Sequence, residues 1–75
     1  MNIIAKRLID LREEKNLKQK DLAALLNIQP SAYSKYETGR VNVPIDNLAK
    51  MSDFYNVNIE YLMGRTDYRT PITKK

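Results

Sequence analysis

The 75 residues include 13 Lys and Arg against 9 Asp and Glu, and the resulting net charge of +4 and pI near 9.5 favour polyanionic partners. Cysteine and histidine are absent, which excludes disulfides and thiolate or imidazole metal sites, and leaves no usual nucleophile and base for an enzyme, so we expect no cofactor. The longest apolar run, residues 22–26, is far shorter than the roughly 20 residues of a membrane span, and Lys6 and Arg7 interrupt any signal-peptide core, so we expect a cytoplasmic protein.

Apolar residues recur every three or four positions in the first half of the chain, which predicts helices at about residues 3–15, 18–26 and 30–38. Only a very short turn separates the last two, and Asn27 tolerates the left-handed conformation that a tight reversal needs. Pro30 suits the first turn of a helix, where its missing N–H would have had no intrahelical partner. Two short helices joined in this way are typical of a helix-turn-helix that reads DNA.

The second half of the chain predicts two more helices and a tail. Pro44 opens the fourth helix, and a short fifth helix is capped by Asn58 and stopped by Gly64. Residues 65–75 have no apolar period and end in two lysines, so we expect a short basic tail that is partly disordered. The sequence therefore predicts an all-α domain of five helices over residues 1–64. The inward stripe expected of the fourth helix is Ile45, Leu48, Met51, Ser52 and Tyr55.

Two charged residues fall beside helix faces that are expected to be buried. Arg12 lies four residues after Leu8, and Glu37 lies four residues after Tyr33. A charge turned toward a core needs a partner, and Arg with Glu can form a bidentate, hydrogen-bonded pair. We hypothesise that the two residues pair and tie the first helix to the third. The alternative is that each is a solvated charge near the end of its helix.

The outward face of the third helix carries short polar side chains that suit contact with a DNA groove. In a helix-turn-helix the first helix crosses the DNA backbone, so we expect Gln19, in the first turn of the helix at 18–26, beside a phosphate. Arg40 and Asn42 lie in the following loop, from which they can reach phosphate as well. The simpler alternative for all these positions is an ordinary solvated surface. The candidates for contact along the third helix are Gln29, Ser31, Ala32, Ser34 and Lys35.

Three segments of the chain, LREEKNLKQKDLAALLNI, YSKYETGR and NLAKMSDFYNVNIEYLMGRTD, carry a resemblance to a known family. In order and spacing they resemble the Cro and phage-repressor type of helix-turn-helix regulators, the XRE-like group, over residues 4–67. The resemblance implies a compact five-helix, lambda-repressor-like DNA-binding domain that usually acts as a dimer on operator DNA. It places Gln19 on the phosphate-contacting position and Arg12 with Glu37 on a buried ion pair. It also places Gln29, Pro30, Ser31 and Lys35 on the variable, base-facing positions of the recognition helix.

The chain departs from the family pattern at the starts of the two central helices. The family commonly has Ser or Thr as the capping residue there, whereas this chain has Lys18 and Gln29. Pro30 replaces a residue that often reaches the DNA. These departures predict weaker caps and fewer direct base contacts, with more reliance on DNA shape.

We interpret the chain as a sequence-specific, double-stranded DNA-binding transcriptional regulator, a repressor that binds operator DNA as a dimer. The alternative is a protein-interaction module on the same fold, such as an antitoxin or an adaptor subunit. The polar, basic face around Ser31 and Lys35 favours DNA, because an interaction surface would show a more apolar patch there. We expect homodimerisation through the fifth helix and the tail, at Ile59, Tyr61, Leu62, Met63 and Tyr68.

Overall fold

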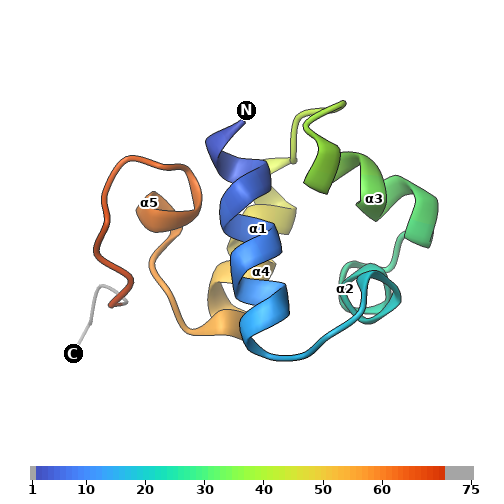
Figure 1. The fold of residues 1–75 in the computed structure, drawn as a ribbon, viewed down its shortest axis with the longest axis horizontal. Helices are drawn as coiled ribbons and strands as arrows, with labels where there is room; N and C mark the ends of the chain where they lie inside the picture. The colour runs from blue at the N-terminus through green and yellow to red at the C-terminus, as the bar shows by residue number, and fades with distance from the viewer. Residues whose placement is uncertain (1, 71–75) are drawn as a thin grey trace.

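Five α-helices make up the fold of residues 2–70, which are the residues that the computed structural model describes (Figure 1). The predicted all-α class is therefore confirmed, and the observed helix ends lie within one or two residues of the expected ones. The helices are α1 (Ile3–Glu14), α2 (Gln19–Leu26), α3 (Pro30–Thr38), α4 (Ile45–Tyr55) and α5 (Ile59–Leu62).

Left-handed residues reverse the chain between the helices, as the sequence predicted for Asn27. Asn16, Asn27 and Asn56 have φ values of 57°, 58° and 58°, a conformation that asparagine adopts more readily than most residues. Gly64 follows α5 at φ 78°, and a Cβ atom there would lie 2.5 Å from the Cγ2 atom of Ile3. Glycine is therefore required at position 64 both by the backbone and by the close approach of α1.

Every helix contributes at least one fully buried side chain to a single core. Leu8, Leu22, Tyr33, Met51 and Leu62 come from α1 to α5 in order, and all are completely shielded from solvent. Burying a large apolar side chain stabilises a fold by roughly 1.5–3 kcal/mol. Because α2 and α3 share this core with the other three helices, the helix-turn-helix is held by the whole domain.

The predicted inward stripe of α4 is correct for its later turns and wrong for its first residue. Leu48, Met51 and Tyr55 are buried, and the half-buried Ser52 donates a hydrogen bond from Oγ to the Val57 carbonyl at 2.6 Å. Ile45, in contrast, is 59% exposed. Periodicity places Ile45 on the same face as the others, but no neighbouring helix covers the first turn of α4.

Residues 65–70, which we call the C-terminal arm, fold back along α1 and α5. The Nδ2 atom of Asn58 donates to the carbonyls of Tyr68 at 2.9 Å and Thr70 at 2.7 Å. The guanidinium of Arg7 donates to the carbonyl of Thr66 at 3.2 Å, and Arg69 forms a bidentate pair with Glu14 on α1. The described part of the tail is thus bound to the domain, whereas the rest of the predicted tail, 71–75, lies outside the described residues.

Candidate nucleic-acid interface

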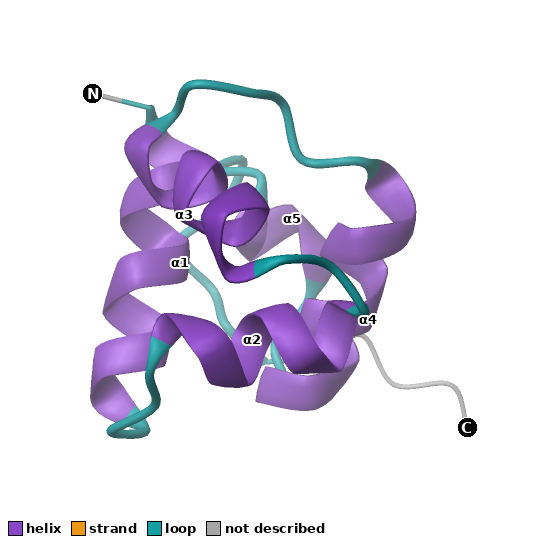
Figure 2. Ribbon diagram, turned by 90° about the vertical axis from the view of Figure 1, so that its right-hand side faces the viewer, coloured by secondary structure: helices purple, strands orange, loops and turns teal. Residues whose placement is uncertain are grey.

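The two helices of the predicted helix-turn-helix, α2 and α3, lie together on one side of the molecule (Figure 2). Leu22, Ala23 and Leu26 of α2 are buried in the same core cluster as Tyr33 and Tyr36 of α3. The turn between them is tight, because the N–H of Ile28 donates to the Ala23 carbonyl at 3.0 Å. α5 and the C-terminal arm lie on the far side of the molecule, which leaves the outer surfaces of α2 and α3 open to a partner.

The outward face of α3 carries most of the side chains that the sequence assigned to DNA. Gln29, Pro30, Ser31 and Lys35 are exposed, while Ala32 and Ser34 are half-buried. Arg40 and Asn42 are exposed in the loop after α3. Among the residues that the structure describes, the large apolar side chains exposed to solvent all lie outside α3. The surface offered by α3 is therefore polar, with hydroxyl, amide and ammonium groups.

A buried carboxylate joins α3 to α1. Glu37 is only 5% exposed, and its Oε2 and Oε1 atoms accept hydrogen bonds from Nε and Nη2 of Arg12 at 2.7 and 3.0 Å. The Tyr33 hydroxyl donates to the same Oε2 at 2.6 Å, and Arg12 also donates from Nη1 to the Leu17 carbonyl at 2.9 Å. The structure thus brings together the two residues that the sequence hypothesis paired.

Hydrogen bonding keeps this buried carboxylate ionised. Burial alone would raise the pKa of Glu37, but hydrogen bonds from Arg12, Tyr33 and Gln19 outweigh it and leave the pKa below its usual range. Burial and the hydrogen bond to Glu37 also raise the pKa of Tyr33, so the phenol keeps its proton and continues to donate. The charged pair is therefore the stable form at neutral pH.

Gln19 has a position that the sequence did not reveal. Its Nε2 atom donates to Oε1 of Glu37 at 3.0 Å, so the side chain expected at a DNA phosphate is turned toward the buried pair. The residue is half-buried at the start of α2. No sequence signal links positions 19 and 37, because the contact depends on how α2 packs against α3.

The starts of α2 and α3 lack side-chain caps, as the sequence predicted. The side chains of Lys18 and Gln29 make no capping hydrogen bond. At α2 the loss is partly offset, because the backbone N–H of Lys18 donates to Oδ2 of Asp21 at 2.8 Å.

Six basic side chains of residues 2–70 lack a carboxylate partner, and four of them lie on the helix-turn-helix and the loop after it, while Lys15 follows α1 and Lys50 lies on α4. Lys18, Lys20, Lys35 and Arg40 are all exposed, and none has a carboxylate partner among residues 2–70. On α1 and in the C-terminal arm, five basic side chains are paired instead with carboxylates. Sequence reasoning missed Lys18 and Lys20, although their positions on either side of Gln19 could have indicated them. The paired cations are Lys6, Arg7, Arg12, Arg65 and Arg69.

Comparison with known proteins places this arrangement in a family. A family profile described as helix-turn-helix matches residues 8–62. The chain belongs to the XRE-like helix-turn-helix family. The HTH-type transcriptional regulator ImmR of Bacillus subtilis (strain 168) is 36% identical over 64 residues, which cover 85% of this chain and 50% of that protein. The cryptic phage CTXphi transcriptional repressor RstR of Vibrio cholerae is 34% identical over 62 residues, covering 83% of this chain and 55% of RstR.

The fold of this family member matches a solved structure as well. The crystal structure of a transcriptional regulator from Listeria innocua has a TM-score of 0.79 at 26% identity, covering 96% of this chain and 64% of that one. The chain spans about half the length of the curated relatives it matches. None of the helices formed by residues 2–70 is long and apolar enough to cross a membrane.

The structure corrects the surface expected for dimerisation. Leu62 is completely buried and Tyr61 is 7% exposed, so the prediction that they contact a second copy is wrong. The guanidinium carbon of Arg7 lies 4.0 Å from the centre of the Tyr61 ring, and α5 packs into the core beneath it. Of the other three residues, Ile59 and Met63 are half-buried and Tyr68 is 78% exposed.

Proposed function

We propose that this protein is a transcriptional repressor that binds operator DNA sequence-specifically as a homodimer, with α3 in the major groove. The observation that carries the proposal is the unpaired positive charge of Lys18, Lys20, Lys35 and Arg40 beside the polar outward face of α3. Relatives named as transcriptional regulators and as a phage repressor support it.

The exposed residues divide into two roles on DNA. Gln29 and Ser31, at the start of α3, are suited to reading base edges through an amide and a hydroxyl. Arg40 and Asn42 in the following loop are suited to phosphate contacts, as is Gln19 through the part of its amide not engaged by Glu37. Lys35, Ser34 and Pro30 complete this surface, with Lys35 able to reach guanine or phosphate.

A dimer supplies the contacts that a single copy lacks. One domain of this size presents one short recognition helix, whereas a two-fold dimer reads two half-sites about 34–36 Å apart on one face of DNA. The alternative of a protein-interaction module on the same fold has less support, because the described face of α3 exposes no large apolar side chain.

Selection of bound DNA from a random genomic library, followed by sequencing and gel-shift titration, tests the proposal. We expect a discrete enriched sequence, bound at least a hundredfold more tightly than random DNA. The double variant Gln29→Ala/Ser31→Ala should lose this preference, whereas Lys50→Ala on α4 is the control with an exposed cation removed elsewhere. Failure to retain any fragment above background would reject DNA binding and favour the protein-interaction alternative.

A further inference from the structure

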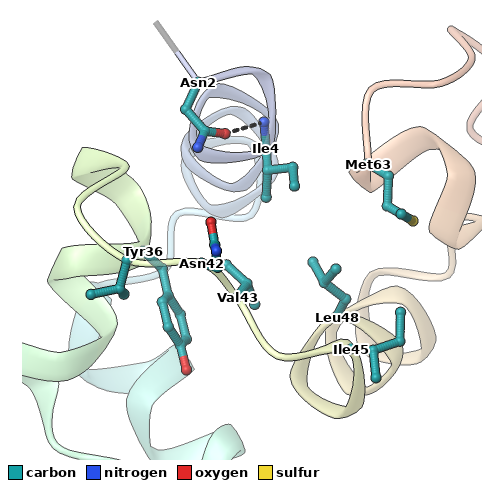
Figure 3. Close-up of a pocket in the computed structure, with 9 residues that line it drawn as sticks. Asn2, Ile4, Tyr36, Asn42, Val43, Ile45, Leu48 and Met63 are labelled. Carbon is teal, nitrogen blue, oxygen red and sulfur yellow. Dashed lines mark hydrogen bonds between the residues drawn. The ribbon is translucent and has the colours of Figure 1, made fainter.

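An apolar groove of about 300 Å³ opens between the start of α1, the loop after α3 and the start of α4 (Figure 3). Ile4, Tyr36 and Leu48 form part of its wall, and Met63 lies across from Tyr36 in the close-up. Its lining includes no charged residue. Val41 and Ile45, two of the lining residues, are 42% and 59% exposed, so apolar side chains protrude beside an apolar hollow.

The shape and charge of this surface suit a second copy of the same chain. A volume near 300 Å³ is at the lower limit of sites for drug-sized ligands, which favours protruding side chains as the occupant. Two copies of a chain with net charge +4 repel each other, and the lining residues of the groove add nothing to this repulsion because none of them is charged. A ridge beside a hollow is also self-complementary about a two-fold axis, since each copy can insert Val41 or Ile45 into the groove of the other.

The groove lies close enough to α3 for a dimer formed there to place its two recognition helices at neighbouring half-sites on DNA. Tyr36 of α3 lines the groove, so two copies joined there have their recognition helices close to the shared axis. The C-terminal arm and α3 lie toward opposite ends of the longest axis of the domain, which measures 36 Å (Figure 1). Copies joined through the arm would hold their α3 helices at the far ends of a body about twice that length, too far apart for half-sites about 34–36 Å apart.

We propose that this groove is the surface through which two copies of the chain associate, with Val41 and Ile45 as its main contacts. The proposal rests on the proposed function for its geometry, and it replaces the arm and the buried residues of α5 as the dimer surface. Met63 is the one residue of the earlier expectation that lines the groove.

Sedimentation of the full chain from micromolar to millimolar concentration, without DNA and with the selected fragment, measures this association. We expect the double variant Val41→Ser/Ile45→Ser to raise the dimer dissociation constant at least tenfold, because each change acts twice in a two-fold contact. Tyr68→Ser is the matched control, since it removes the most exposed apolar side chain of the arm and should leave the constant unchanged. All three side chains are exposed, so the variants should retain the fold, which a thermal melt verifies.

The absence of cysteine provides a second measurement. Ile45→Cys should be joined into dimers by a short bis-maleimide at low protein concentration, whereas Tyr68→Cys should stay monomeric. A wild-type chain that is monomeric alone and on DNA, or an arm variant that loses association instead of the groove variant, would overturn the inference. If only the proposed function fails, the result is different: the chain still dimerises through the groove but binds no DNA.

Discussion

Replacing Glu37 by alanine removes one carboxylate that accepts four hydrogen bonds. Arg12 loses two of its three hydrogen bonds and is left as a largely buried cation, since its side chain is only 16% exposed. The hydroxyl of Tyr33 and the amide of Gln19 lose their acceptor as well. Breaking a buried pair by removing one partner typically costs about 3–5 kcal/mol, and a domain of this size has a total stability of only a few kcal/mol. We therefore expect Glu37→Ala to be largely unfolded at 37 °C.

The same carboxylate should make stability depend on pH. The pKa of Glu37 is lower in the folded protein than in the unfolded chain, so its contribution is fully present above about pH 4.3, the unfolded value, and is lost as pH falls through the folded pKa. Glu37→Gln should therefore flatten the acid limb of the stability curve. The exposed pair of Glu14 with Arg69 also lowers the pKa of Glu14, which makes Glu14→Gln the matched control for a surface carboxylate.

Urea unfolding followed by circular dichroism at pH 7 and pH 3 measures both effects. For Glu37→Ala we expect the largest loss of stability, with Arg12→Ala close behind because it leaves the buried carboxylate without its cation. If both variants lose less than roughly 1 kcal/mol in the free energy of unfolding, the pair contributes no more than an exposed ion pair does, and the reasoning is refuted.

Three further changes test the interface and one backbone position. Gln29→Ala should weaken operator binding by about 1–3 kcal/mol with little effect on random DNA, and equal losses in fluorescence anisotropy on both DNAs would reject a base-reading role. Arg40→Ala should weaken both DNAs alike and make the slope of log affinity against log salt shallower by about one unit, while Lys50→Ala leaves the slope unchanged. Gly64→Ala should cost at least about 1–3 kcal/mol in a thermal melt, because φ is 78° and the new Cβ meets Ile3 at 2.5 Å. Combining it with Ile3→Ala should recover the steric part of that loss, and no recovery would assign the cost to the backbone alone.

Helix ends were predictable because a few residues carry their own backbone preferences. Asn27 and Gly39 adopt the left-handed conformation at low cost, and Pro30 starts a helix without losing a hydrogen bond, whatever the rest of the chain does. The helix-turn-helix depends on these local choices, so its limits could be derived before its packing was known.

Contacts that depend on packing could not be derived in this way. The period of α4 places Ile45 in the apolar stripe, but whether another element covers that turn is a property of the assembled fold. The C-terminal arm is bound through Asn58 and Arg7 to backbone carbonyls, and such bonds leave no apolar period in the sequence. The amide of Gln19 can serve a phosphate or a carboxylate equally well, and only the approach of α3 places Glu37 beside it.

The single carboxylate of Glu37 explains how a small core can hold a recognition helix in a defined orientation. Its hydrogen bonds reach Arg12 on α1, Gln19 on α2 and Tyr33 on α3 itself. Apolar contacts are non-directional and permit α3 to rotate slightly about its own axis, whereas these bonds depend on distance and angle. Side chains that read bases must be held to within roughly 0.5 Å, and their support has to come from rigid neighbours. We therefore expect the buried pair to support the proposed reading of DNA by orienting Gln29 and Ser31, which are exposed at the start of the same helix.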